Sequence, residues 1–534
     1  MPNQENTRRN VLLIMCDELR PDFLNAYGAD FIPTPNIDAL AKEGVVFDNA
    51  ITASTVCAPA RMSFFTGRNV SGHDAWTNNI PPKDGCEILP ERLNNAGYMT
   101  AAVGLYDHAP NDYDYGYKYR NIALPGFEGC NYTKYIREKH PEQKGFFANG
   151  EGYFKYPEEE YYDRWSADRA IEFIESYTKT GKAPNGASPE TENAPFFLYC
   201  GFECPHIPLT PPGEVAGTVA EDRIPDVLVQ ERPDDDIPTV ELYRRAFLNP
   251  TEVIKNPHAL DEKRKRDRVL YCEMIVEIDN LVGRIVKSLK DNGIYDNTTI
   301  IFTSDHGSCE NDYNLMTKGP WPYKPQLFIP MIISNHPGLD KGTRCDALCG
   351  GLDLGGTVLE IAGDEKEFGV SRSMVGLAMG TVPEREVNMS EFCDSCKTLV
   401  DKQYTFTYYP FTEKTCLFDR VNDPEEKVNL AGRPEYMALE YRFMKHIVDF
   451  MILAKGVRIE AHDLTRDVHE GIAKKNPKFL DSFDIAYPIA SWRAVERLEA
   501  LGLDSMYNEF CKEREIKAHY GVYFHEERPE KKQS

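Results

Sequence analysis

The chain has 534 residues, enough for several domains or for one large α/β enzyme built around a single sheet. Its 61 Lys and Arg residues against 85 Asp and Glu give a net charge of −24, which argues against a nucleic-acid partner because phosphates demand surplus cations. Hydrophobic residues make up 41%, enough for a large core and against wholesale disorder. No apolar run approaches the roughly 18 residues of a membrane-spanning helix, so we expect no membrane partner either.

The N-terminal residues are basic and lead at Val11 into a short apolar run, which superficially suggests a signal peptide. The run ends at Asp17-Glu18 without a small-residue cleavage site, so it is more typical of a buried first strand. Without an export signal we expect a cytoplasmic protein whose 14 cysteines stay thiols. No close cysteine pair has a second Cys or His pair at zinc-finger spacing, so we expect half-buried thiols instead of structural zinc.

Apolar runs typical of strands buried on both faces alternate along the chain with segments of helical spacing. The predicted strands are residues 11–16, 100–103, 196–201, 298–303 and 328–334. The predicted helices are residues 36–43, 88–95, 163–177 and 269–292. This alternation predicts an α/β fold in which a large, mostly parallel sheet lies between helices, with functional side chains at the carboxyl ends of the strands.

Two stretches break this alternation, and we expect both to be surface insertions. Residues 111–162 are rich in Tyr, Gly and charge, and residues 181–193 form a Pro/Ser/Thr/Gly stretch. From about residue 386 the pattern changes to short alternating runs, which predict a small antiparallel sheet followed by helices and a charged tail. We therefore place a catalytic domain at 1–385 and a smaller C-terminal subdomain at 386–534.

The most informative stretch is Cys57-Ala58-Pro59-Ala60-Arg61. Pro59 suits the first turn of a helix, which places Cys57 at or just before the helix N-terminus, in the positive field of the dipole. The backbone N–H groups there favour anions, and Arg61 lies one turn further on, where it can hold such a group in place. From these residues alone, a low-pKa thiol or a plain buried cysteine fits as well as a nucleophile.

The surrounding motifs resemble those of the sulfatase family, whose signature C-x-P-x-R holds the cysteine that is converted to formylglycine. The resemblance runs in order over about residues 10–431 and is carried by residues 34–38, 41–47, 57–61, 89–104, 303–307, 318–323 and 417–431. It implies an alkaline-phosphatase-like sulfatase fold and a sulfuric ester hydrolase, of which arylsulfatases are one kind. It further implies hydrolysis of sulfate monoesters through a formylglycine derived from Cys57 and one divalent metal.

By the same resemblance, Asp17, Asp305, His306 and the modified Cys57 are the first ligands of the metal. Asp17 and Asp305 each follow a predicted strand, so their carboxylates can meet at the carboxyl edge of the sheet. Many sulfatases have Asn at the place of His306, and an imidazole moves the expected metal from calcium towards manganese, zinc or iron. Glu18 stands where many have a second Asp; it either ligates the metal, supports its ligands or is a solvated acid.

The resemblance adds His206 and Lys318 to Cys57 and Arg61 as catalytic residues. His206 lies in a Pro-His-Ile-Pro run just beyond a predicted strand, and the prolines restrict the backbone that aims its imidazole at a leaving group. Lys318 precedes a Gly-Pro-Trp-Pro-Tyr run and supplies a cation to the transferred group. An isolated histidine is more often structural and a lone lysine more often a solvated charge, but these motifs favour function.

The chain departs from most sulfatases after Gly104, where they have Lys-Trp-His and it has Leu-Tyr-Asp-His at 105–108. The lysine that contacts sulfate is therefore missing, and Tyr106 and His108 are candidate partial replacements in substrate binding. The branch of phosphonate monoester hydrolases and relaxed arylsulfatases also lacks this lysine and has a histidine after the later Asp, as here. That branch also has an Asn near the place of Asn78, which is the third candidate for substrate binding.

The predicted function is hydrolysis of sulfate monoesters, with hydrolysis of phosphonate monoesters or phosphodiesters as the alternative. A phosphotransferase of the wider alkaline-phosphatase group would use Thr or Ser in place of Cys57, and a catalytically inactive binding protein would have lost site residues. The expected partners are a small-molecule or saccharide sulfate ester and a formylglycine-generating or sulfatase-maturating enzyme. The helices predicted after Pro434 have amphipathic spacing and could pack against a second subunit, so a homo-oligomer is a further expected partner.

Overall fold

The computed structural model describes residues 8–106, 115–124, 129–141, 152–228, 232, 236–242, 262–410 and 414–454. The chain divides by its contacts into two units that are not continuous in sequence. The first unit comprises residues 1–225, 262–308 and 325–388, and the second comprises residues 226–261, 309–324 and 389–534. Segments far apart in sequence therefore build each unit.

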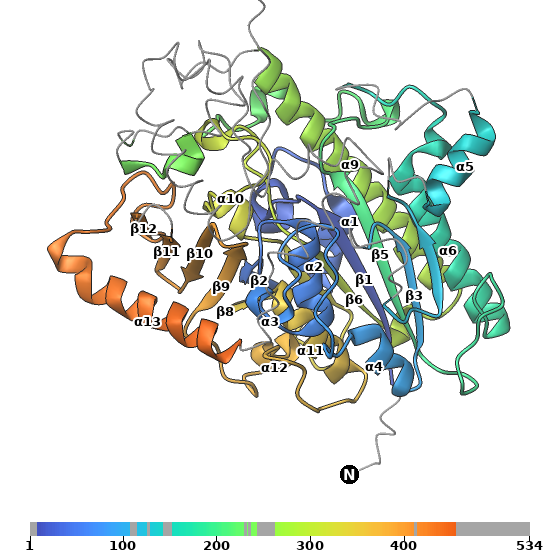
Figure 1. The fold of residues 1–534 in the computed structure, drawn as a ribbon. Helices are drawn as coiled ribbons and strands as arrows, with labels where there is room; N and C mark the ends of the chain where they lie inside the picture. Colours follow the sequence, from blue (N-terminus) through green and yellow to red (C-terminus); the bar gives the residue numbers. More distant parts are fainter. Residues whose placement is uncertain are drawn as a thin grey trace, which may run out of the picture. The chain divides into compact units, whose positions relative to one another are not determined.

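An eight-stranded sheet forms the centre of the first unit, in the order β4-β3-β5-β1-β6-β7-β2-β8 (Figure 1). Its strands are β1 Asn10–Asp17, β2 Gly44–Ile51, β3 Met99–Gly104, β4 Tyr119–Ile122, β5 Phe196–Pro205, β6 Thr298–Ser304, β7 Met331–Ser334 and β8 Thr343–Gly350. Neighbouring strands are parallel except at β7, which is antiparallel to both β6 and β2. The mostly parallel sheet is thus confirmed, and β1, β2, β3, β5 and β6 all point the same way.

The two faces of this sheet pack against separate apolar cores. In β1 the even-numbered residues Leu12 to Cys16 point into one core and the odd-numbered residues Val11 to Met15 into the other. The first core includes side chains of α1 Pro35–Lys42, α6 Tyr162–Thr180 and α9 Glu262–Asp291. The second includes side chains of α2 Cys57–Thr66, α4 Leu89–Asn95, α11 Leu354–Ile361 and α12 Met374–Ala378. Because both faces are covered, the central strands are continuous apolar runs.

One prediction for this unit was wrong. Residues 111–162, expected as a surface insertion, contain β4, which pairs with β3 and forms one edge of the sheet. They also contain α5 Asn131–Lys139, whose Tyr132 is buried in the first core. The sequence Tyr-Arg-Asn-Ile of β4 is too short and too polar to show a strand pattern. Residues 181–193 form a loop, mostly exposed, as expected.

The second unit contains a four-stranded antiparallel sheet in the order β12-β11-β10-β9, which confirms the sheet predicted after residue 386. Its strands are β9 Asn388–Phe392, β10 Cys396–Val400, β11 Tyr404–Tyr409 and β12 Lys414–Asp419. The helix α13 Met437–Leu453 packs on this sheet through Phe443, whose ring stacks on Phe406 with centroids 5.4 Å apart. A further helix predicted at residues 491–501 lies outside the described residues.

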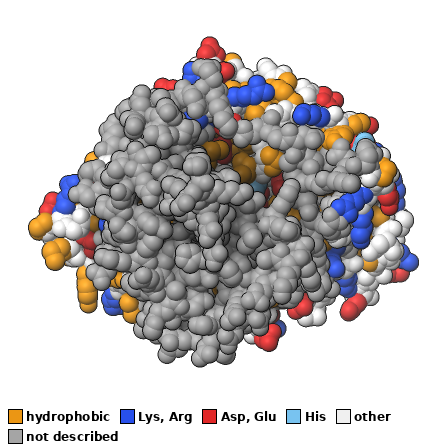
Figure 2. All heavy atoms as spheres, turned by 45° about the horizontal axis from the view of Figure 1, so that its top comes forward, with side chains coloured by type: hydrophobic (Ala, Val, Ile, Leu, Met, Phe, Trp, Pro, Cys, Tyr) orange, Lys and Arg blue, Asp and Glu red, His pale blue; other side chains and the backbone are white. Residues whose placement is uncertain are grey.

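Two further short α-helices of the described chain are α3 Val70–His73 and α10 Lys324–Leu327, and several single-turn 3-10 helices lie in the connections. On the face drawn in Figure 2, basic and acidic side chains are interspersed with hydrophobic ones over the described part. Among the described helices, none combines the length and the apolar character needed to cross a bilayer. The 13 cysteines within the described ranges are free thiols.

Candidate active site

Two aspartates leave the sheet side by side at its carboxyl edge. Asp17 ends β1 and Asp305 directly follows β6, and the parallel register of these strands sets Cys16 beside Ser304. The backbone N–H of Asp305 donates to the carbonyl of Cys16 at 3.1 Å, so the hydrogen bonding between the two strands extends as far as the residues that carry the carboxylates. Both side chains are buried. The structure therefore brings the two predicted ligands together at the place where parallel sheets collect functional groups.

Cys57 reaches the same edge from β2. A loop of five residues follows that strand, and α2 begins at Cys57, as the position of Pro59 predicts. The Cys57 thiol lies 3.4 Å from Oδ1 of Asp17 and is buried. Asn78 accepts a hydrogen bond from the backbone N–H of Ala58 at 3.1 Å, which places this predicted substrate-binding residue beside the start of α2.

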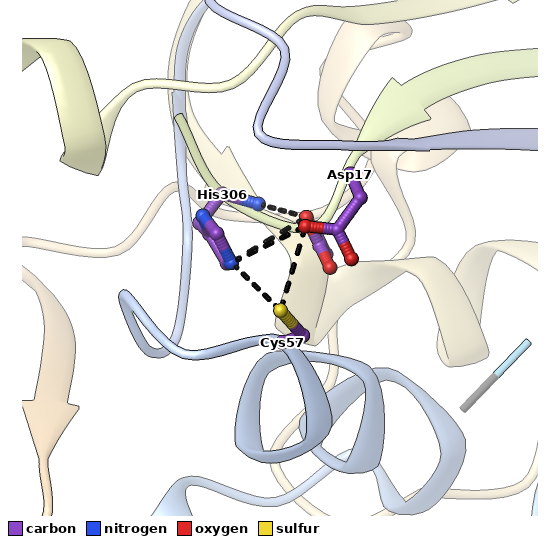
Figure 3. A group of neighbouring side chains, drawn as sticks. Asp17, Cys57 and His306 are labelled. Carbon is purple, nitrogen blue, oxygen red and sulfur yellow. Dashed lines mark hydrogen bonds and ion pairs between the residues drawn. The ribbon is translucent and has the colours of Figure 1, made fainter. Parts of the chain in front are cut away.

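His306 directs one ring nitrogen toward the Cys57 sulfur and the carboxylates of Asp17 and Asp305. Its Nδ1 lies 2.8 Å from the carbonyl of Gly307, which can only accept, so Nδ1 carries the hydrogen and Nε2 has the lone pair. Nε2 lies 3.3 Å from the Cys57 sulfur and 3.8 Å from Oδ1 of both Asp17 and Asp305. Figure 3 shows Cys57, Asp17 and His306 pointing toward one another. Carbonyl contacts of this kind commonly orient metal-binding histidines.

Four ligand atoms in this group fit a single metal ion. They lie within 4.8 Å of one another, and their residues, all buried, are Asp17, Cys57, Asp305 and His306. The buried carboxylates of Asp17 and Asp305 each supply an oxygen to this group, and a divalent cation is a partner that stabilises buried carboxylates. The donor set therefore suits one divalent ion, with carboxylate and imidazole ligands.

Arg61 joins the two aspartates from α2. Its Nε donates to Asp305 at 2.9 Å and its Nη2 to Asp17 at 3.1 Å, while Nη1 donates to the carbonyl of Leu105 at 2.9 Å and to the Tyr199 hydroxyl at 2.6 Å. The side chain is fully buried. Burial disfavours the charged guanidinium, but Tyr199, Asp305 and Asp17 outweigh it and raise the pKa of Arg61 well above its usual value. Arg61 is therefore a permanent cation that orients the carboxylates.

Glu18 and His206 form a second group next to Asp17. Glu18 is fully buried, which rules out a solvated surface acid, and its φ of 66° is a left-handed conformation unusual for a side chain of this size. His206 Nε2 lies 3.4 Å from Glu18 Oε1, and its Nδ1 contacts the carbonyl of Ile207, which assigns the hydrogen to Nδ1. Asp17, Glu18 and His206 also offer three ligand atoms within 4.8 Å. Glu18 thus belongs to the site.

The other predicted residues lie in different settings. Tyr106 is buried and its hydroxyl accepts from Nη1 of Arg120 at 3.2 Å, while its ring packs edge-on against Tyr115. Lys318 is buried, so it is not a solvated surface charge, and it belongs to the second unit; its role stays a prediction. His108 lies outside the described residues.

Two residues with structural roles at this site were missed from the sequence. Tyr199 sits in the middle of β5, where the sequence predicted only a buried apolar strand, yet its hydroxyl accepts from Arg61. The second residue, His73, contacts α2 through Ser63. Its Nδ1 accepts from the N–H of Ala75 at 3.1 Å, so its Nε2–H donates to the Ser63 hydroxyl at 3.0 Å. A polar group inside an apolar run was the available signal for Tyr199.

Comparison with known proteins identifies the family. The family model for Sulfatase matches residues 9–364, two thirds of the chain. The chain belongs to the sulfatase family. As a member, it is a sulfuric ester hydrolase by class.

The relatives of this sulfatase are of more than one kind. The multifunctional alkaline phosphatase superfamily protein PehA of Trinickia caryophylli is 29% identical and covers 81% of this chain and 93% of its own. An arylsulfatase of Clostridium perfringens is 27% identical, with 80% and 91% covered. The crystal structure of the phosphonate monoester hydrolase of Agrobacterium radiobacter aligns with a TM-score of 0.68 at 22% identity, over 84% of this chain and 96% of that one. The predicted alkaline-phosphatase-like fold is thus confirmed.

The environment of His73 predicts how acid affects stability. Burial lowers the pKa of His73 to about 3, whereas an unfolded histidine titrates near about 6.5. Between these pH values His73 binds a proton in the unfolded chain but stays neutral in the folded protein. The stability that comes from keeping His73 neutral is therefore complete above about pH 6.5 and is lost as the pH falls. In a His73→Gln variant, the unfolding free energy from urea titrations should decline less steeply from pH 6.5 to 4, by up to ~1.4 kcal/mol per pH unit. Equal slopes in variant and wild type would contradict this assignment.

Proposed function

We propose that this sulfatase hydrolyses sulfate monoesters with a formylglycine made from Cys57 and one divalent metal held by Asp17, Asp305 and His306. The observation that carries the proposal is the position of Cys57. Its sulfur lies 3.4 Å from Asp17 Oδ1 and 3.3 Å from His306 Nε2, at the first residue of α2. A nucleophile made from this side chain would share its surroundings with the metal and with the anion-favouring start of a helix.

The two groups supply complementary chemistry. When bound, the metal supplies a Lewis acid, and formylglycine supplies an aldehyde whose hydrate carries a nucleophilic hydroxyl. The chain's own residues hold these groups in place: Arg61 fixes Asp17 and Asp305, and the N-terminus of α2 faces the negative charge that develops. Such preorganised charge is usually the largest electrostatic contribution to catalysis.

Proton transfer to the departing oxygen falls to His206 in this proposal. Its Nδ1 is held by the Ile207 carbonyl, so Nε2 is the atom that exchanges a proton with the leaving group. Glu18 faces the same nitrogen and either ligates the metal or supports its ligands. Lys318 contributes a cation to the transferred group, and Asn78 binds the substrate beside the start of α2.

Maturation of Cys57 requires a separate enzyme under this proposal. The Cys57 side chain is 1% exposed, so an enzyme that oxidises it cannot reach it in the folded protein. The formylglycine-generating or sulfatase-maturating enzyme would therefore act before α2 packs against the sheet.

The first test addresses the nucleophile. Peptide mass spectrometry of protein coexpressed with a maturation enzyme should find residue 57 converted to the aldehyde, and Cys57→Ala should lose aryl sulfatase activity by at least about a hundredfold. Cys86→Ala, which alters a half-buried thiol outside the site, is the matched control and should keep activity. Full activity of Cys57→Ala would exclude the proposed mechanism.

The second test addresses the metal. Elemental analysis should find about one divalent ion per wild-type chain, and much less in Asp305→Asn, because that variant removes a charged ligand from a buried site. Asp30→Asn changes an aspartate that is 88% exposed and should keep the wild-type metal content. Unchanged occupancy in Asp305→Asn would remove Asp305 from the ligand set.

Hydrolysis of phosphonate monoesters or phosphodiesters is the second candidate, and it is supported by the resemblance of Leu105, His306 and Asn78 to the phosphonate monoester hydrolase branch. Leu105 stands where most sulfatases have a lysine, and the Leu105 side chain is 1% exposed and uncharged. A sulfate monoester, a phosphodiester and a phosphonate monoester each carry one negative charge, whereas a phosphate monoester carries nearly two at neutral pH. The loss of one cation therefore favours the monoanionic substrates as a class.

The third test ranks these substrates. We expect kcat/KM to be highest for aryl sulfate and lowest for aryl phosphate monoester among four substrates with a matched leaving group, the others being phosphonate monoester and phosphodiester. A Leu105→Lys variant should improve the phosphate monoester relative to the other three, because it restores a cation. Preference of the wild type for the phosphate monoester would overturn the charge argument, and preference for the phosphonate would make the second candidate the function.

A further inference from the structure

The backbone that carries His206 is held in a tight turn at the end of β5. The strand ends at Pro205, directly before His206, and the N–H of His206 donates to the carbonyl of Glu203 at 2.9 Å. The side chain of His206 then meets Glu18 at one ring nitrogen and the Ile207 carbonyl at the other. Its position depends on whatever fixes residues 203 and 204.

A single buried carboxylate fixes both residues. Asp163 lies in the first turn of α6, and its Oδ1 accepts from the N–H of Glu203 while its Oδ2 accepts from the N–H of Cys204, each at 2.9 Å. Each oxygen of Asp163 serves one N–H group, whereas an asparagine in the same orientation would present its carbonyl oxygen to one of them and its NH2 group, a donor, to the other. Charged acceptors also make stronger hydrogen bonds than neutral ones.

The side chain of Cys204 is held from the same end of α6. The Tyr161 hydroxyl lies 2.9 Å from the Cys204 sulfur and donates to the Tyr162 hydroxyl at 3.2 Å. All of these side chains are buried. Helix α6 thus holds residues 203 and 204 through the backbone and through one side chain.

The carboxyl group of Asp163 is expensive to keep at this place. Burial raises the pKa of Asp163 to about 7, well above the ordinary value of an aspartate. An asparagine at position 163 would avoid that penalty, but in the same orientation its NH2 group would face one of the two N–H groups, which would then lose its acceptor. The buried carboxyl group of Asp163 therefore costs stability, and what it provides in return is the fixed backbone of residues 203 and 204 at the end of β5.

We infer that Asp163 is a positioning residue for His206: it clamps the N–H groups of Glu203 and Cys204 and so fixes the turn from which His206 reaches the leaving group. This inference rests on the proposed function, in which His206 protonates the departing oxygen. Asp163 has no hydrogen bond to Asp17 or Cys57 among the described residues, so any effect on the reaction is indirect and passes through the segment that carries His206.

The test compares leaving groups that differ in their need for a proton. Asp163→Asn should lower kcat/KM about tenfold or more with phenyl sulfate, a poor leaving group, and less than about threefold with para-nitrophenyl sulfate. Destabilisation alone would lower both rates by the same factor. His206→Ala should show the same dependence on the leaving group with a larger loss.

A double-mutant cycle then shows whether Asp163 acts through His206. In the His206→Ala background, Asp163→Asn should change kcat/KM with phenyl sulfate by less than about twofold, because the group it positions is absent. Asp279→Asn is the matched control: Asp279 is equally buried, and its carboxylate also accepts from two consecutive N–H groups, those of Asn36 and Ile37, at the start of α1. It should lower stability without changing the dependence on the leaving group.

Each outcome decides one proposal. Losses that simply add in the double variant, or equal losses with both leaving groups, would overturn the role of Asp163 and leave the proposed function standing. If matured wild type hydrolyses none of the four ester classes, the proposed function fails and this inference fails with it. Should Asp163→Asn not fold, Asp163→Glu keeps the charge but displaces the carboxylate by one methylene, and the same cycle applied to it decides the question.

Discussion

The site depends on one buried cation between two strand ends. Arg61 is fully enclosed, and its hydrogen bonds reach four strands of the sheet or the residues that follow them: Asp17 of β1, Asp305 after β6, Leu105 after β3 and Tyr199 of β5. A buried ion pair contributes little net stability, but removal of one partner leaves an uncompensated charge and costs about 3–5 kcal/mol. The arrangement of the whole carboxyl edge is thereby tied to a single residue of α2.

This contact changes the interpretation of the arginine in the Cys-x-Pro-x-Arg motif. The sequence shows that Arg61 lies one turn after Cys57, where it faces negative charge, and carboxylates and a substrate anion satisfy that requirement equally well. In the structure, Nε and Nη2 are directed at Asp305 and Asp17. Arg61 therefore acts first on the residues proposed to hold the metal, and it affects the reaction through them.

Features that depend on local chemistry could be predicted from the sequence. Apolar runs predicted the central strands, and the acids directly after two of them predicted the meeting of Asp17 and Asp305. The proline at position 59 predicted that α2 begins at Cys57. Buried strands and helix starts have sequence signals because each is decided by residues that are neighbours in the chain.

Features that depend on distant contacts could not be predicted. Tyr199 is 138 positions from Arg61 and Asp163 is 40 positions from Glu203, and in each case the pattern of the element shows only which face is buried. The edge strand β4 was missed for a related reason, because its pairing with β3 comes from the sheet and not from its own four residues. The function of such residues becomes visible only when both partners are placed.

The departure from most sulfatases at position 105 does not affect the hydrogen bond that this residue makes to Arg61. The carbonyl of Leu105, not its side chain, accepts from Arg61, and any residue offers that carbonyl. The path of the backbone there is set by Gly201: a Cβ at residue 201 would lie 1.6 Å from the Leu105 oxygen, so only glycine leaves room for it. A lysine or a leucine at 105 therefore offers Arg61 the same acceptor. The residue type at this position can vary without loss of the contact, because the contact uses the backbone alone.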